Sequence, residues 1–95
     1  MTGTPHKLIL FISGMSVKSS HAIENIKAIC DKYLQEQVSL EIIDISKEKE
    51  KAAEYGIFAI PTLIKLEPAP KRIIIGDLSD TAQVLKSLDI LSWKK

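Results

Sequence analysis

The chain has 95 residues, of which 13 are basic and 12 acidic, and its formal net charge is +1. This length suits one domain, and the charge balance argues against a strongly basic nucleic-acid-binding surface or a polybasic membrane patch. Hydrophobic residues make up 45% of the chain, and the single cysteine, Cys30, excludes a disulfide framework within it. We therefore expect one cytoplasmic domain over residues 1–95, without signal peptide, membrane span, metal or cofactor.

The first half of the chain predicts a strand, a long helix and a second strand. A strand is expected over 7–12, because the continuous apolar run from Leu8 to Ile12 is typical of a strand covered on both faces. Apolar residues at helical spacing predict a helix over 18–35 that is capped by Ser16 or Ser19. A strand is expected over 38–45, and because the intervening segment is long enough for a helical crossover, the two strands should be parallel.

The second half predicts a short charged helix, a hairpin and a final helix. The helix is expected over 47–55, with Ser46 as its N-cap and Gly56 at its end. Strands are expected over 61–66 and 72–75 as an antiparallel hairpin, because the connection between them is short.

A final helix is expected over 79–91, with Ser79 and Asp80 at its start. The isoleucine- and leucine-rich segments are expected to form the core. His6 is expected in a flexible terminus and His21 on an exposed surface, so neither histidine indicates a catalytic or metal site.

The resulting order, β-α-β-α-β-β-α, resembles the thioredoxin fold, an α/β fold with a mixed four-stranded sheet. Pro61 at the start of the third strand belongs to this resemblance, which implies a cis bond before it. The reactive dithiol of that fold lies between the first strand and the first helix, but residues 13–19 contain no cysteine here. Cys30 falls on the apolar stripe of the expected helix, which favours a packed core cysteine over a reactive thiol.

Several short segments together resemble the KaiB family of circadian clock proteins over nearly the whole chain. They are Ile43-Asp44-Ile45, Ile60-Pro61-Thr62-Leu63, Pro68-Ala69-Pro70, the run from Lys71 to Ser79 with its Gly76-Asp77-Leu78-Ser79 end, and Leu88-Asp89.

The resemblance implies a non-enzymatic adaptor that binds the ring-shaped ATPase KaiC and modulates its phosphorylation cycle. It implies candidate contacts at Lys51, Tyr55 and Arg72. It also implies two alternative folds of the C-terminal half: a helix over 79–91 indicates the thioredoxin-like state, whereas a strand there indicates a self-associating ground state, a dimer or tetramer. The positions with a structural or switching role are Pro61, Pro68, Pro70, Gly76, Asp77, Ser87 and Asp89.

Four positions depart from the family pattern. Ala69 interrupts a run of prolines, and Ser87 replaces a glycine, which costs about 1 kcal/mol more than a good helix former inside a helix. Ser87 should therefore favour the helical state. His21 replaces an arginine and Glu41 a lysine at positions that help to engage the clock protein KaiA, so KaiA binding is not expected. Two other functions remain open: a KaiB-fold signalling or stress-adaptation module with another partner, and, less favoured, a thiol-dependent enzyme.

Overall fold

A computed structural model of the chain describes residues 6–14, 16–34 and 38–88. Its elements follow the predicted order, with a π-helical turn added after the first helix. They are β1 (His6–Ile12), α1 (Val17–Ile29), η1 (Cys30–Leu34), β2 (Val38–Asp44), α2 (Lys49–Tyr55), β3 (Thr62–Glu67), β4 (Arg72–Ile75) and α3 (Thr81–Ser87).

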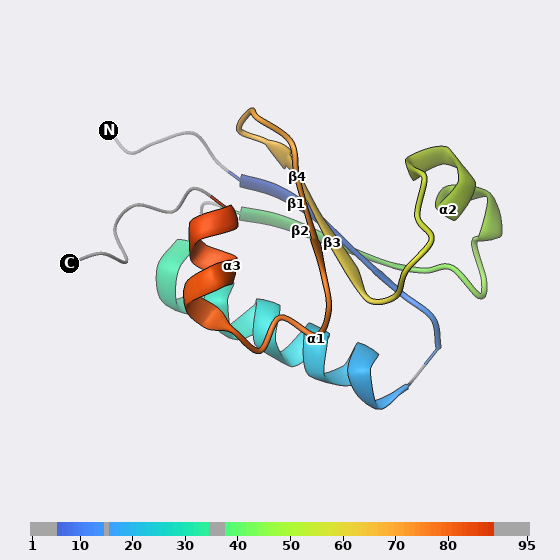
Figure 1. The fold of residues 1–95 in the computed structure, drawn as a ribbon, viewed down its shortest axis with the longest axis horizontal. Coiled ribbons are helices and arrows are strands. Elements are labelled where there is room, and N and C mark those ends of the chain that lie inside the picture. Colours follow the sequence, from blue (N-terminus) through green and yellow to red (C-terminus); the bar gives the residue numbers. More distant parts are fainter. Residues whose placement is uncertain (1–5, 15, 35–37, 89–95) are drawn as a thin grey trace.

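The four strands form one mixed sheet in the order β2-β1-β3-β4. β1 pairs with β2 in parallel, whereas the β1–β3 and β3–β4 pairs are antiparallel. Helices α1 and α3 lie on one face of the sheet and α2 lies on the other (Figure 1). The predicted mixed sheet, parallel first pair and antiparallel hairpin are therefore confirmed.

The alternation of side chains along β1 divides the core into two parts. Leu8 and Leu10 point towards α1 and α3, whereas Ile9 and Phe11 point towards α2. All four are almost fully buried, because β1 has a neighbouring strand on each side and helices over both faces. This placement explains the uninterrupted apolar run by which the strand was predicted.

Helix α1 begins as predicted and ends earlier. Ser16 is its N-cap, and the Ser16 hydroxyl accepts a hydrogen bond from the Ser19 amide at 3.1 Å. The expected continuous helix becomes a π-helical turn from Cys30 to Leu34. Leu34 stays on the same buried stripe as Cys30 through this turn.

Helix α2 begins at Lys49, two residues later than predicted, and Ser46 is not its cap. The Ser46 hydroxyl and amide both donate to the Asp44 carboxylate, at 2.6 and 3.0 Å, so Ser46 belongs to the turn after β2. Glu48 occupies the N-cap position without a side-chain hydrogen bond. Gly56 ends the helix as predicted, in the left-handed conformation with φ of 68°.

The C-terminal half has the thioredoxin-like arrangement, because residues 81–87 form a helix rather than a strand. Asp80 is the N-cap of α3, and its carboxylate accepts from the Gln83 amide at 3.2 Å. The bond before Pro61 is cis, as the resemblance implies, and the bonds before Pro68 and Pro70 are also cis.

Two expectations about exposure and mobility were wrong. Ile73 and Ile75 on β4 are 56% and 60% exposed, because no helix covers their face of this edge strand. His6 is the first residue of β1, and its Nε2 lies 3.2 Å from the Leu88 carbonyl oxygen, which connects the sheet to the end of α3. Within the described residues, no helix has the length and apolar character needed to span a bilayer.

Candidate functional site

The loop between β1 and α1, where redox-active members of the thioredoxin fold carry a dithiol, is tied to the rest of the structure by hydrogen bonds. The Gly14 amide donates to the Asp44 carboxylate at 3.0 Å, which ties the loop to the end of β2. The same carboxylate accepts the two bonds from Ser46. These donors, with the Ser46 hydroxyl first, hold the pKa of Asp44 below its ordinary value of 3.8.

Cys30 lies in the core at 6% exposure and is a free thiol. Burial raises the pKa of this thiol to about 11, and the neighbouring Asp31 charge adds to the shift. Because only the thiolate is nucleophilic, the burial and the raised pKa of Cys30 oppose a nucleophilic role at neutral pH. The structure thus agrees with the predicted core cysteine.

The candidate contact residues Lys51 and Tyr55 lie on α2, a helix without a buried residue. The Tyr55 ring packs against Phe11 with ring centroids 5.3 Å apart and planes at 54°, which anchors the helix to the sheet. Arg72 is exposed on β4, two residues before Ile74 and on the same face of the strand. Ile74 belongs to the part of the core that lies on the sheet face covered by α1 and α3. The alternation of the strand therefore places Arg72 on the opposite sheet face, apart from the other two candidates.

An apolar surface lies between α2 and the edge of the sheet, and sequence reasoning missed it. We call Phe58, Ile73 and Ile75 the apolar edge patch; Phe58 is 92% exposed. The three side chains border a hollow of about 50 Å³ that Ile57 and Thr62 also line. The one signal in the sequence was an aromatic residue in the loop before Pro61, where no helix or strand pattern requires it.

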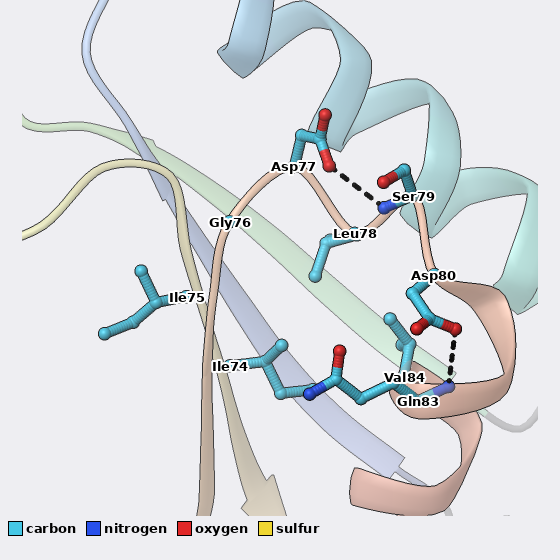
Figure 2. Close-up of a pocket in the computed structure, with 9 residues that line it drawn as sticks. All are labelled: Ile74, Ile75, Gly76, Asp77, Leu78, Ser79, Asp80, Gln83 and Val84. Atoms are coloured by element: carbon cyan, nitrogen blue, oxygen red, sulfur yellow. Dashed lines mark hydrogen bonds between the residues drawn. The ribbon is translucent and has the colours of Figure 1, made fainter.

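A second hollow, of about 90 Å³, lies over the loop from Gly76 to Asp80 (Figure 2). The Asp77 carboxylate accepts from the Ser79 amide at 3.1 Å, and the Ser79 hydroxyl and amide lower the pKa of Asp77. The Asn25 side chain on α1 donates to the Asp77 carbonyl at 2.8 Å. Leu78, buried with φ of 65°, fixes the loop from the inside, so this segment is a structural connection to α3.

The remaining candidate positions lie in different places. Pro68 and Pro70 form the β3–β4 turn, and Ser87 is the last residue of α3. Asp89 lies outside the described residues. Across residues 6–14, 16–34 and 38–88, no group of three or more histidine, cysteine, aspartate or glutamate side chains could hold a metal ion.

Lys65 is a further residue that the sequence did not single out. It lies on β3 with no solvent exposure. The strand lies between β1 and β4 inside the sheet, and a fully buried lysine is exceptional. Its place between the apolar residues Ile64 and Leu66 was the only signal.

Comparison with known proteins gives one consistent result at the level of sequence. A family model described as the KaiB domain matches residues 9–90. "Circadian clock protein KaiB3" of Synechocystis sp. is 48% identical over 84 residues, which cover 88% of this chain and 82% of that relative. "Circadian clock oscillator protein KaiB" of Gloeothece citriformis is 42% identical over 84 residues, which cover 88% of this chain and 79% of that relative.

Solved structures give the fold. The N-terminal domain of SasA from Synechococcus elongatus superposes with a TM-score of 0.73 at 24% identity, over 94% of this chain and 88% of that one. The thioredoxin Deadhead from Drosophila melanogaster gives a TM-score of 0.72 at 17% identity, over 92% of this chain and 81% of that one. The thioredoxin-like fold expected from the sequence is therefore confirmed.

Proposed function

Because the chain belongs to the KaiB family, we propose that it is a clock or signalling adaptor that binds a KaiC-like ATPase. In this role it modulates the phosphorylation cycle of the ATPase and catalyses no reaction itself. The observation that carries the proposal is the match of the KaiB domain model to residues 9–90. The buried, protonated Cys30 favours this role over a thiol-dependent enzyme.

Helix α2 is the element best suited to meet the partner. None of its residues is buried, so its outer surface is available, while the Tyr55–Phe11 contact anchors it to the sheet. A rigid surface loses less conformational entropy on binding than a mobile one. Lys51, half-buried on this helix, is the cation that we assign to the contact.

Binding of KaiA is not part of the proposed function. His21 is exposed on α1 and Glu41 is exposed on β2. At these positions the resemblance implies an arginine and a lysine, so Glu41 presents a negative charge where the partner meets a positive one. Like charges placed together oppose association.

Native mass spectrometry with the KaiC-like ATPase of the same organism tests the proposal. The ATPase should be measured with ATP and with ADP, and in both phosphorylation states. We expect a complex in at least one state and a change in the rate of phosphorylation when it forms. The absence of a complex in every state would overturn the proposal, and an adaptor for a different signalling partner would take its place.

Charge reversal separates the role of α2 from a general charge effect. Lys51→Glu should weaken the complex by about tenfold or more, because it places an acidic group within the contact. Lys27→Glu is the matched control, since Lys27 is exposed on α1, on the other side of the sheet. Equal affinities of the two variants would remove α2 from the interface.

A further inference from the structure

The first turn of helix α1 carries two serines three residues apart, Ser16 and Ser19. Ser16 is the N-cap, and its hydroxyl accepts a hydrogen bond from the Ser19 amide at 3.1 Å. The Ser20 amide donates to the Ser16 carbonyl at 2.9 Å, so the turn fixes both the side chain and the backbone of Ser16. Residues at this spacing in a helix have Cα atoms about 5 Å apart, which is a distance that a disulfide can span.

The two hydroxyls differ in their surroundings. Ser16 is exposed, whereas Ser19 is fully buried, and the Ser19 Oγ has no hydrogen-bond partner among the described residues. Such a hydroxyl is unusual in a folded protein, because nothing offsets the loss of its hydration. A thiol at the same place would avoid most of this cost, since a buried cysteine behaves as a small apolar group. Position 19 is therefore better suited to cysteine than to serine.

An exposed group beside a buried one is the arrangement that disulfide exchange requires. The attacking thiolate must be accessible to the substrate, whereas the second thiol reacts only within the chain. A helix N-terminus lowers the pKa of a thiol and so supplies the thiolate. The exposed Lys18 would add to this effect at position 16, and the Asp44 carboxylate, which binds the Gly14 amide, would oppose it.

We infer that the first turn of α1 keeps the backbone of a disulfide-exchange site, with two oxygen atoms where the reaction needs sulfur. Ser16 stands at the position of the attacking thiol, and Ser19 stands at the position of the thiol that completes the reaction. The inference is independent of the proposed adaptor role, because it concerns the chemistry that this turn can support and not a partner. The substrate class is an accessible disulfide in a peptide.

The double substitution Ser16→Cys/Ser19→Cys would supply the two missing sulfur atoms. The thiolate at position 16 would attack one sulfur of the substrate disulfide, form a mixed disulfide and release the other sulfur as a thiolate, which takes up a proton. The thiol at position 19 would then lose its proton, attack the sulfur at position 16 and release the second substrate thiol. Two electrons and two protons pass in this way from the protein dithiol to the substrate disulfide.

Incubation with oxidised glutathione, followed by mass spectrometry, tests the inference. We expect the double variant to lose two hydrogen atoms and to carry no glutathione. Ser16→Cys/Ser20→Cys is the matched control, because Ser20 lies in the same turn but its side chain leaves the helix about 100° away from that of Ser19. Its internal disulfide should be about tenfold or more less populated, with glutathione attached instead.

Reduction of insulin disulfides, with dithiothreitol as the reductant, gives the activity readout. Ser16→Cys/Ser19→Cys should accelerate the reaction, whereas the control pair and the parent chain should not. The parent chain also measures any background from Cys30, which is buried and free. A double variant that folds but forms no internal disulfide would overturn the inference, and so would a control pair that forms one equally well.

Thermal unfolding gives a readout that needs no introduced thiol. Ser19→Ala should raise the midpoint by about 4 °C or more, because it removes a buried hydroxyl that has no partner. Ser20→Ala, on the same turn and half-buried, gains only helix propensity and should raise the midpoint less. A lower midpoint for Ser19→Ala would show that serine itself is required at this position, and the inference would be wrong.

Discussion

The Asp44 carboxylate accepts three hydrogen bonds from two segments, the loop after β1 and the turn after β2, and its charge makes this connection dependent on pH. Its pKa is below 3.8, with the Ser46 hydroxyl as the largest cause. A lowered pKa in the folded state stabilises the protein above the pKa of the unfolded state, and this contribution disappears as the pH falls through the folded value. We expect Asp44→Asn to lower the free energy of unfolding at pH 7, with a difference from the parent chain that shrinks below about pH 4.

Urea unfolding at pH 7 and at pH 2.5 measures this difference. Ser46→Ala removes the largest donor, so it should have the same direction and a smaller size. The coupling between the two substitutions in a double-mutant cycle should be present at pH 7 and vanish in acid. A difference that is equal at both pH values would show that the Asp44 charge does not contribute to stability.

The burial of a single residue could be predicted where it lies in a regular helix or strand pattern. It could not be predicted where it depends on how other parts of the chain pack around the residue. Cys30 lies on the apolar stripe of a helix, and the structure confirms that it is buried. Lys65 looks like an ordinary strand lysine in the sequence, but it is fully buried in the structure, because its burial depends on how the rest of the chain packs over β3. Phe58 is in a loop, where neither helical nor strand spacing carries information about exposure.

Gly56 decides where helix α2 ends. Its φ of 68° lies in the left-handed region, and a Cβ at this position would meet nothing within 4 Å. A side chain there is therefore opposed by backbone strain alone. We expect Gly56→Ala to lower the free energy of unfolding by about 1 kcal/mol, as measured by chemical denaturation.

Gly56→Asn provides the matched control for this substitution. Asparagine adopts the left-handed conformation more readily than alanine, so it should cost less. If both variants were equally stable and matched the parent chain, the helix would end for a reason other than the conformation of Gly56. The test is sensitive because α2 has no buried residue whose packing could compensate.

Element boundaries were predicted well where the side chain of the boundary residue has one available partner. Ser16 and Asp80 follow this rule, and both are N-caps. Ser46 does not, because Asp44 lies two residues away and accepts both of its hydrogen bonds, so the helix begins later. The π-helical turn after α1 was not predicted, since the spacing of Ile26, Cys30 and Leu34 fits an α-helix as well.

At the scale of the whole molecule, the sequence predicted the order and direction of the strands but not which apolar residues stay exposed. The parallel β1–β2 pair follows from a helical crossover, and the β3–β4 hairpin follows from a short proline-containing turn. The exposure of Ile73 and Ile75 depends on β4 being at an edge that no helix covers. Apolar composition alone describes β4 and the central strand β1 in the same way.

The balance between the two folds implied for this family belongs to the whole molecule, and Ser87 is the position that we propose to influence it. Ser87 is the last residue of α3, so replacing it by glycine should cost less than the roughly 1 kcal/mol of a helix interior. We expect Ser87→Gly to raise the population of the alternative fold by less than about fivefold. Two-dimensional NMR with exchange-transfer measurements would quantify both populations.

Ser20→Gly separates a bias between folds from a general loss of stability. Ser20 lies in α1, in the half of the chain that the proposed refolding leaves unchanged, so glycine there should destabilise both folds alike. Its population ratio should therefore equal that of the parent chain, although its free energy of unfolding is lower. If Ser20→Gly shifted the ratio as far as Ser87→Gly, or if neither changed it, the end of α3 would have no specific influence on the choice of fold.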